Sequence, residues 1–450
     1  MELGMNDLLD SPCGLSHEWT FEANRQGAWV CHPGGRYALP VHDARLMDLM
    51  QDWMARPRRL AELAEACPVR LRKKWQVLVD FLVQGVFLAY YPEIGGENWA
   101  AVVPMSSFFV PQVPPDGPVR LSRFALLRQE AGAWILESPT ALCKLRIADV
   151  HLTMAILALG SGAQAPAADM QHARLLLGAC GMLERADAAE SDALAMWEFH
   201  DLYFHARSRL GRTNAPFGHS PRFEGRIAPL PALKPRPAVP MIPLAKPDLE
   251  ALAEREASLS VIMERRRSSR KQGEPVLTVR ELGEFLFRSA RATQLAEKAG
   301  YPVSQRVYPN AGASYELEIY VSVRDCRGLD GGFYLYDPMQ HGLYLLRAED
   351  DETEDLVAAA NFGDKPDFQP QVMLHFAARF GRNGWKYQSI NYAATLKNVG
   401  VLMQSMCLVA TSMQLAACPW SAGNADRFHR VAGTDYYAET SVGEFLLGGA

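Results

Sequence analysis

The stretch GWKYQSINYAATLKNVGVLMQSMCLVATSMQLAA, residues 384–417, decides the fold of the C-terminal half of this chain. From residue 390 onwards it is apolar nearly all round when it is wound as a helix. A helix of this composition is buried on most of its faces, because it has no polar side to present to water. The stretch therefore predicts a long helix, residues 390–417, at the centre of a domain or in a subunit interface.

Five shorter stretches around this helix have the composition of strands. They are rich in aromatic and β-branched residues, and they alternate or run apolar. They are residues 313–323, 331–337, 342–347, 372–380 and 439–448. Helical segments lie between and around them, so residues 250–450 are predicted to form an α+β domain.

Lys386 and Tyr387 stand side by side near the start of the quoted stretch. Both side chains have unperturbed pKa values near 10, so either could move a proton once its surroundings shifted that value. In a regular strand the two would point to opposite faces. An irregular junction between the strand at 372–380 and the long helix can instead aim both into one site. The pair is the leading catalytic candidate; two surface residues that happen to be adjacent are the alternative.

A basic cluster, ERRRSSRKQ at residues 264–272, ends the helical segment 248–266. Arginine presents a fork of donors that matches phosphate oxygens, and serine hydroxyls add further donors. The cluster is therefore a candidate phosphate site. The alternative is a solvated helix end, because the helix macrodipole favours positive charge there.

Two loops are rich in small residues. They are YPNAGASYELEIY at residues 308–320, which enters a predicted strand, and CPWSAGNADRF at residues 418–428, which follows the long helix. Small residues let the backbone approach a flat ligand closely. Both loops are candidate ligand-binding segments, and ordinary connecting loops are the alternative.

No metal site is expected from the histidines and cysteines. His200 and His205 lie five residues apart in WEFHDLYFHARSR, residues 197–209, and do not share a helix face well, so core or interface packing is predicted for them. The eight cysteines are scattered and never form Cys-x-x-Cys. This spacing indicates buried thiols in a reducing compartment rather than disulfides or structural zinc.

A proline-dense segment, residues 211–249, separates the two halves of the chain. Proline removes backbone donors and biases its neighbours towards extended structure. The segment is therefore predicted to be an ordered extended arm or an interdomain linker.

The N-terminal half contains a faint internal repeat. GAWV at residues 27–30 recurs as GAWI at residues 132–135, and helical stretches follow each copy. Each copy ends in an apolar run with glycine, FLVQGVFL at 81–88 and LLLGACGML at 175–183, where a helix stops and a short strand begins. The pattern predicts a duplicated unit, with chance similarity as the alternative.

The duplicated unit has the order of a winged helix, so winged-helix-like domains are predicted at residues 15–95 and 119–210. Some winged helices bind DNA and others bind peptides along the groove between helix and strand. Apart from RLRKKW at residues 70–75, the predicted helices are not strongly basic. The net charge of -5 also argues against a partner held by phosphate contacts, so no nucleic acid is expected.

The bulk composition is that of a globular protein with two or three domains, at 450 residues, 48% hydrophobic and 22% charged. The N-terminus has neither a basic region nor an apolar core of a secretory signal. No run approaches the eighteen apolar residues of a membrane span, so no membrane segment is expected. These features predict a cytoplasmic location.

Taken in order, these motifs resemble the flavin-dependent nitroreductase-like superfamily. They resemble more closely the SagB-type dehydrogenases and, within them, the azoline oxidases of cyanobactin-like peptide pathways. The resemblance runs from about residue 197 to the C-terminus, and tandem winged-helix units are also typical of that subfamily. The motifs that carry it are WEFHDLYFHARSR (197–209), RRSSR (266–270), GASYELEIYV (312–321), WKYQ (385–388), LKNVGVLMQ (396–404) and ETSVGEFLLG (439–448).

The resemblance implies a mixed sheet flanked by helices, with FMN bound at the interface of a homodimer. Lys386 and Tyr387 match the family's proposed proton-transfer element. The FMN contacts that it implies are Arg266, Arg267, Ser268 and Arg270 at the phosphate and ribityl chain, Pro309, Asn310, Ala311 and Gly312 along the isoalloxazine ring, and the backbone of Ser421, Ala422 and Gly423 near N5 and O4.

Two positions depart from the family's pattern. Asn310 and Ala311 stand where relatives usually have serine and glycine in a Pro-Ser-x-Gly loop, which could alter the flavin contacts. The long helix reads Asn398-Val399-Gly400-Val401 where the broader family favours Asp-Ala-Gly-His, and we interpret this difference as a subfamily trait.

The resemblance implies an enzyme that oxidises thiazoline or oxazoline rings of a ribosomally made peptide to azoles. A hydride would pass to FMN N5 and a proton to the Lys-Tyr pair. Our hypothesis gives Tyr387 the proton transfer, with its pKa lowered by the neighbouring Lys386 ammonium; the reverse assignment stays open. Dioxygen would reoxidise the flavin, because the chain has no Gly-x-Gly-x-x-Gly fingerprint for NAD(P).

The N-terminal domains would then recruit the leader of the peptide substrate, which raises its effective concentration, or would pack on the catalytic dimer. Two other functions are considered. One is an NAD(P)H-dependent nitro- or quinone reductase on the same fold. The other is a winged-helix regulator without enzyme activity, whose C-terminal half senses a ligand.

Overall fold

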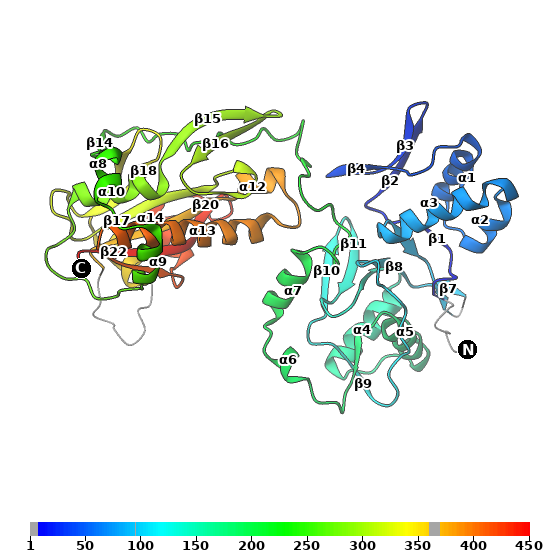
Figure 1. The fold of residues 1–450 in the computed structure, drawn as a ribbon. Helices are drawn as coiled ribbons and strands as arrows, with labels where there is room; N and C mark the ends of the chain where they lie inside the picture. Colours follow the sequence, from blue (N-terminus) through cyan, green and yellow to red (C-terminus); the bar gives the residue numbers. More distant parts are fainter. Residues whose placement is uncertain (1–7, 95, 360–369) are drawn as a thin grey trace. The chain divides into compact units, whose positions relative to one another are not determined.

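The structure is a computed structural model, and it describes residues 8–94, 96–359 and 370–450 (Figure 1). The chain divides into two compact units. The first comprises Met1–Arg222 with Gln388–Ile390, and the second comprises Phe223–Tyr387 with Asn391–Ala450. Each unit has its own hydrophobic core, so each is described by itself.

The first part of unit 1 consists of a strand, a three-stranded meander, three helices and a closing strand. The strands of the meander pair in the order β2-β3-β4, and β5 returns antiparallel to β1. The elements are β1 (Cys13–Leu15), β2 (Thr20–Asn24), β3 (Gly27–His32), β4 (Gly35–Ala38), α1 (Ala44–Ala55), α2 (Leu60–Ala66), α3 (Arg72–Gln84), β5 (Leu88–Tyr90), β6 (Glu93–Ile94) and β7 (Glu97–Asn98).

The second part of unit 1 has nearly the same order of elements. Strands β10, β11 and β12 form an antiparallel meander, two helices follow, and β13 returns antiparallel to β9. The elements are β8 (Ala100–Pro104), β9 (Val119–Leu121), β10 (Leu126–Glu130), β11 (Ala133–Glu137), β12 (Cys143–Ile147), α4 (Val150–Ser161), α5 (Ala167–Ala179), β13 (Leu183–Arg185), α6 (Asp192–Ala195) and α7 (Phe199–Arg207).

This shared order places the repeated sequence motifs at equivalent positions. GAWV begins β3 and GAWI lies in β11, each the middle strand of its meander. The two glycine-containing runs each end a helix, α3 or α5, and lead into the closing strand of their copy. The repeat in the sequence is therefore also a repeat of topology, while the winged-helix character of the two copies stays a prediction.

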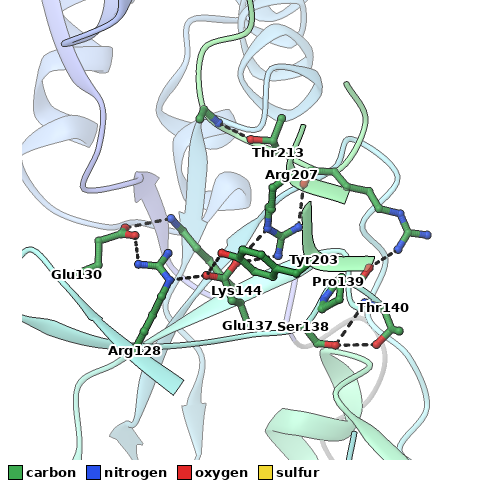
Figure 2. Close-up of polar contacts among 12 residues, drawn as sticks. Arg128, Glu130, Glu137, Ser138, Pro139, Thr140, Lys144, Tyr203, Arg207 and Thr213 are labelled. Atoms are coloured by element: carbon green, nitrogen blue, oxygen red, sulfur yellow. Dashed lines mark hydrogen bonds and ion pairs between the residues drawn. The ribbon is translucent and has the colours of Figure 1, made fainter. Parts of the chain in front are cut away.

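Helix α7 is fixed to the second meander through a buried carboxylate (Figure 2). Glu137, at the end of β11, is 1% exposed and accepts from Arg128 Nε at 2.7 Å, Tyr203 Oη at 3.0 Å and Arg207 Nη2 at 2.8 Å. Burial opposes ionisation, but the two guanidinium groups more than offset it and hold the pKa of Glu137 below its usual value. Tyr203 and Arg207 thus attach α7 to β11, and removing Arg207 would leave the buried carboxylate with only Arg128 as an ion-pair partner among the described residues.

The predicted core packing of His200 and His205 is wrong. Both side chains are exposed, and Ala206 is the residue of α7 that is fully buried. The attachment of this helix is polar, through Tyr203 and Arg207, so it does not need apolar or histidine packing on its other positions. Interface packing of the histidines stays a prediction.

Unit 2 is built on a seven-stranded sheet with the order β14-β19-β18-β17-β20-β22-β21. The strands of the unit are β14 (Met241–Pro243), β15 (Ala292–Lys298), β16 (Tyr301–Arg306), β17 (Leu317–Val323), β18 (Gly332–Asp337), β19 (Gly342–Ala348), β20 (Val372–Arg379), β21 (Ala416–Trp420) and β22 (Glu439–Gly448). The helices are α8 (Leu249–Arg255), α9 (Leu259–Arg265), α10 (Val279–Ala290), α11 (Asp351–Ala358), α12 (Phe380–Lys386), α13 (Asn391–Ser412) and α14 (Ala425–Ala432), with a 3₁₀ turn η2 at Ala311–Ala313.

The α+β class of unit 2 is confirmed, but its sheet is not mixed. Every pairing between the described strands of this sheet is antiparallel. Short connections join β17, β18 and β19 as successive hairpins, and such connections can only produce antiparallel neighbours. All five predicted strands are present, whereas β14, β21 and the hairpin β15–β16 were not predicted as strands.

The long helix lies against the sheet as its central core element (Figure 1). Leu402, Met406 and Ala410 of α13 are fully buried in one cluster with Phe376 and Phe445 of the sheet. The helix ends at Ser412, five residues earlier than predicted, and the chain returns as strand β21. Gln414 adopts φ +56, a left-handed conformation that ends helical winding at this point.

By length and composition alone, α13 is apolar enough to cross a membrane, although no such segment was expected. No other helix of the described ranges passes the same test. Its packing against β21, β22 and α10 accounts for the apolar composition, because a helix buried in the core of a sheet domain needs apolar side chains just as a membrane-spanning helix does.

The predicted helical segment 248–266 is two short helices, α8 and α9. Glu256 is extended, with φ -75 and ψ 145, and it separates them. Asp248 caps α8 by accepting from the backbone N–H groups of Glu250 and Ala251.

The proline-dense segment is ordered and bound to unit 2 from residue 227 onwards. Its C-terminal part, β14, pairs with β19 as the edge strand of the sheet. Polar contacts from the domain hold the rest. They are Trp385 Nε1 to Ile227 O, Arg382 Nη1 to Leu230 O, Arg379 Nη1 to Pro231 O, Lys234 to Glu439 and Arg236 to Asp337. The segment is therefore ordered along unit 2 and also connects unit 1 to unit 2, and its assignment as an arm or as an interdomain linker stays a prediction.

Candidate active site

Lys386 and Tyr387 lie where a helix gives way to extended backbone. Strand β20 turns directly into α12, which ends at Lys386, and Tyr387 is extended, with φ -129 and ψ 141. The predicted irregular junction is therefore mostly a short helix. The backbone changes from helical at Lys386 to extended at Tyr387. This change has the effect predicted for an irregular junction, because both side chains reach one loop.

That loop is the small-residue segment at Gly312. Lys386 Nζ donates to the Gly312 carbonyl oxygen at 2.6 Å. A Cβ atom built on Gly312 would lie 2.1 Å from Tyr387 Oη and 2.9 Å from Lys386 Nζ, which leaves no room for a side chain. Gly312 also adopts φ +61, a conformation that glycine tolerates best. The structure thus brings the Lys-Tyr pair and the predicted ring-binding loop together.

The pKa values of Lys386 and Tyr387 are shifted in opposite directions. Burial, assisted by the positive charges of Arg382 and Lys298, lowers the pKa of Lys386. Burial and the negative charge of Glu316 raise the pKa of Tyr387. The lowering expected for Tyr387 is therefore wrong, because burial and Glu316 outweigh the neighbouring ammonium. Lys386 is therefore easier to deprotonate, and Tyr387 harder to deprotonate, than an exposed residue of its kind.

A buried carboxylate shapes the loop from behind. Glu316 is 0% exposed and accepts from Asn310 Nδ2 at 3.0 Å and from Asn398 Nδ2 at 2.8 Å. Asn398 Oδ1 in turn accepts from the Ala311 N–H at 3.1 Å. The two asparagines that depart from the family's pattern therefore share one structural task. Sequence reasoning missed Glu316, and its only signal was a carboxylate inside the apolar run at 313–323.

The basic cluster lies beside strand β21. The Ser269 N–H donates to the Ala417 carbonyl at 2.8 Å, and the Arg270 guanidinium lies 5.5 Å from the centroid of the Trp420 ring. No ion pair within residues 8–94, 96–359 and 370–450 involves Arg266, Arg267 or Arg270. Guanidinium groups without a carboxylate partner, next to the Ser268 hydroxyl, are a donor set that suits a phosphate.

Ser421, Ala422 and Gly423 form an exposed turn that follows β21. The Gly423 N–H donates to Glu444 Oε2 at 3.0 Å, and a Cβ atom on Gly423 would lie 1.9 Å from Glu444 Oε1. Glu444 is 2% exposed, and burial raises its pKa to about 7. This glutamate was not identified from the sequence, where it is one polar residue within the final predicted strand.

The predicted site residues thus fall into three groups, two of which lie along α13. Lys386, Tyr387 and the loop at Gly312 meet α13 at Asn398, while the basic cluster follows α9, which packs on α13 near Cys407. Nine residues of helix separate these positions, a span of about 13 Å by the helical rise. Among the described residues, no contact joins Lys386 directly to the cluster or to the turn at 421–423.

Comparison with known proteins extends this picture. Residues 263–448 match the nitroreductase family, and residues 119–214 match the cyanobactin oxidase ThcOx family. A protein of Methanocaldococcus jannaschii named as a nitroreductase is 32% identical over 169 residues, which cover 38% of this chain and 78% of the relative. The chain belongs to the nitroreductase family. It carries a ThcOx-type region ahead of its nitroreductase domain, as the motif order predicted.

Solved structures that resemble part of this chain include a Ralstonia eutropha protein described as a nitroreductase. It is 23% identical, with 49% of this chain and 97% of that chain covered and a TM-score of 0.38. Another is the Escherichia coli microcin synthetase McbBCD complex with truncated pro-MccB17, at 18% identity, 58% and 94% coverage and a TM-score of 0.34. Superpositions this loose carry no argument about function.

Membership of the nitroreductase family makes the protein an oxidoreductase. The reading of the chain as a regulator without enzyme activity is therefore wrong. The nitroreductase domain also fits the cofactor expected for it. Arginines that form no ion pair within the described part of the chain, beside a serine hydroxyl, suit a phosphate, and the exposed Gly312 backbone offers a surface that a flat ring can approach.

Proposed function

We propose that this protein is an FMN-dependent azoline oxidase, which converts thiazoline or oxazoline rings of a ribosomally made peptide into azoles. The observation that carries the proposal is the convergence of Lys386 Nζ and Tyr387 Oη on the backbone of Gly312. The match of residues 119–214 to the cyanobactin oxidase ThcOx family supports the substrate class.

In this proposal Arg266, Arg267, Ser268 and Arg270 hold the FMN phosphate and ribityl chain. The loop from Pro309 to Gly312 and the backbone of Ser421, Ala422 and Gly423 would hold its isoalloxazine ring. When bound, FMN supplies an acceptor for the hydride that leaves the ring carbon, and dioxygen regenerates that acceptor.

The protein's own groups manage the proton. Lys386, whose pKa is lowered by partial burial and by the charges of Arg382 and Lys298, takes the proton from the azoline ring in its uncharged form. The ammonium that forms is stabilised by the Gly312 carbonyl and by the Tyr301 ring, whose centroid lies 4.8 Å from Nζ. Tyr387 stays protonated and orients the substrate by donating a hydrogen bond. This reverses the roles that the sequence first suggested, since the pKa of Tyr387 is raised.

The rest of the chain would serve recruitment and assembly. The duplicated unit ahead of the nitroreductase domain is proposed to bind the leader of the peptide, which raises the local concentration of the rings to be oxidised. A homodimer that completes the FMN site and a cytoplasmic location belong to the same proposal.

The experiment is to incubate the purified protein with a synthetic thiazoline-containing peptide in air. We expect flavin absorbance in the protein and the loss of two hydrogens per ring by mass spectrometry. A Lys386→Ala variant with its flavin retained serves as the control.

A second function has one observation in its favour, since the Methanocaldococcus jannaschii relative is named as a nitroreductase. Steady consumption of NADPH with a nitroaromatic compound, without any oxidation of the azoline peptide, would establish that reductase and overturn the azoline proposal.

A further inference from the structure

Arg382 is a buried cation that has no carboxylate partner within the described ranges. Its side chain is 0% exposed, and no ion pair found in residues 8–94, 96–359 and 370–450 includes it. Its donors all go to backbone carbonyls. They are Nε and Nη2 to Ser314 O at 2.9 and 2.6 Å, Nη2 to Pro302 O at 2.8 Å and Nη1 to Leu230 O at 2.7 Å.

These carbonyls belong to three different segments of unit 2. Ser314 ends the loop that begins at Pro309, Pro302 lies in β16, and Leu230 lies in the proline-dense segment. A planar guanidinium can reach all three at once because its donors are arranged as a rigid fork, which a lysine ammonium lacks. Arg382 therefore fixes helix α12 against the loop that Lys386 contacts.

Arg382 and Lys386 also share a ring. The Arg382 guanidinium carbon lies 4.7 Å from the centroid of Tyr301, and Lys386 Nζ lies 4.8 Å from the same centroid. The Tyr301 hydroxyl donates to the Arg382 carbonyl oxygen at 2.5 Å, which holds the ring in place. Residues 382 and 386 are one helical turn apart in α12, so both cations stand on the same side of that helix.

The other groups that face Lys386 supply no negative charge that would offset the positive charge of Arg382. Lys298 of β15 is a further cation, Tyr301 of β16 and Tyr387 are phenols, and the Gly312 carbonyl is uncharged. Glu316 lies behind the loop, where Asn310 and Asn398 hold it, and its charge acts on Tyr387. Like charges in a poorly solvated site disfavour the second cation.

We propose that Arg382 is a positioning residue for Lys386: it holds α12 against the Gly312 loop and places a second positive charge on the side of α12 that carries Lys386. The role in catalysis rests on the proposed function, whereas the effect of Arg382 on Lys386 does not. The lowered pKa of Lys386, with Arg382 as its principal electrostatic cause, agrees with this geometry.

The test is the pH dependence of lysine acylation by trace acetic anhydride, followed by peptide mass spectrometry on the full chain without substrate. Exposed Lys271 serves as the internal reference. We expect the labelling midpoint of Lys386 to lie below that of Lys271 in the wild type. Arg382→Met should raise the Lys386 midpoint by about one pH unit. Arg236→Met, which removes an arginine paired with Asp337 in the same unit, should leave it unchanged.

Arg382→Lys distinguishes the effect of the positive charge on Lys386 from the effect of the hydrogen bonds on stability. It can be measured even if Arg382→Met does not fold. It keeps the positive charge but loses the fork, so thermal stability should fall while the Lys386 midpoint stays low. Equal midpoints for Lys386 and Lys271 in the wild type would overturn the proposal. So would an unchanged Lys386 midpoint in folded Arg382→Met, or a midpoint raised as far in Arg382→Lys as in Arg382→Met.

The labelling readout is independent of turnover. If Arg382→Met raises the midpoint while Lys386→Ala still oxidises the azoline peptide fully, the influence of Arg382 stands and the catalytic assignment of Lys386 fails. If Lys386→Ala is inactive but Arg382→Met leaves the midpoint unchanged, the proposed function stands and this inference fails.

Discussion

Lys386 and Gly312 are joined by a hydrogen bond in which the lysine Nζ donates to the glycine carbonyl oxygen at 2.6 Å. Tyr387 Oη reaches the same glycine, at the position that a Cβ atom would take. The backbone of one loop, rather than another side chain, therefore brings the two proton-bearing groups of the candidate site together.

Gly312→Ala is expected to reduce turnover far more than stability. The methyl group would lie 2.1 Å from Tyr387 Oη and 2.9 Å from Lys386 Nζ, and both are free ends of flexible side chains that can swing away. The fold would then lose about 1 kcal/mol for an alanine in the left-handed region, but the pair would be displaced. Steady-state oxidation of the azoline peptide and thermal unfolding, measured on the same sample, check both effects.

Gly300→Ala is the matched control for this change. Gly300 adopts φ +74 in the turn between β15 and β16, and a Cβ atom there would meet nothing within 4 Å. Gly300→Ala should therefore destabilise the fold about as much as Gly312→Ala does, but leave turnover unchanged. Equal losses of turnover in the two variants would show that Gly312 matters only for folding.

Lys386→Ala and Tyr387→Phe should both lower kcat while FMN remains bound. General acid or base catalysis typically contributes about 10²–10⁴-fold, and we expect the larger loss for Lys386→Ala because it removes the base. Initial rates of ring oxidation, with flavin content measured by absorbance, give the result. Full turnover in both variants would mean that the pair is structural.

The pH profile should distinguish the two possible bases. A base must be deprotonated to act, so kcat/KM should rise with pH and level off at the pKa of that base. For Lys386 the plateau should begin below the ordinary lysine value of 10.5, because its pKa is lowered. For Tyr387 the rise should continue beyond the ordinary tyrosine value of 10.0, because its pKa is raised. Rates measured from about pH 6 to 11 decide between them, and a rise that continues to the end of this range would restore the original assignment to Tyr387.

Arg266→Gln and Arg267→Gln should each weaken FMN binding by about 10- to 100-fold. A charge-assisted hydrogen bond contributes about 1.5–3 kcal/mol, and these guanidinium groups have no ion-pair partner in the described residues. Fluorescence titration of flavin-free protein with FMN measures the change. Arg265→Gln, which alters the exposed last residue of α9 outside the motif, should bind FMN as the wild type does.

The sequence could predict the elements that local pattern determines. Alternation and apolar runs identified the strands at 317–323 and 439–448 and the core helix α13. Short connections imply the antiparallel pairing of β17, β18 and β19, but the sequence could not predict how β14 and β20 pair, because their partners β19 and β17 lie far away in the chain. The end of α13 was missed for a different reason, since Gln414 carries no composition signal for its left-handed conformation.

The candidate site likewise contains residues that the sequence predicted and residues that it did not. Lys386, Tyr387 and Gly312 were predicted from motifs and do meet in the structure. Arg382 and Glu316 were not, because their tasks come from distant partners. The bond from Arg382 to Leu230, for example, spans 152 residues of sequence. A buried charge within an apolar segment is the one signal that such residues leave in the sequence.

Glu444→Gln is expected to stabilise the protein at alkaline pH and not at acid pH. Glu444 is 2% exposed, and its pKa rises from 4.5 to about 7 in the folded state because burial disfavours the carboxylate. Folding therefore favours the protonated form, and the contribution of this group to stability is lost as the pH rises from about 4.5 through 7. Above that range the wild type must bury a carboxylate, at a cost of up to about 3 kcal/mol, whereas glutamine has none to ionise.

Glutamine also keeps an oxygen that can accept the Gly423 N–H, so the turn at Ser421–Gly423 should hold its shape. Denaturant unfolding at about pH 5 and pH 8.5 should show the variant gaining stability over the wild type only at the higher value. Glu264→Gln, which removes a charge from an exposed position of the same unit, should show no such difference. A variant less stable than the wild type at pH 8.5 would mean that Glu444 is ionised and needed as a carboxylate by the turn it supports.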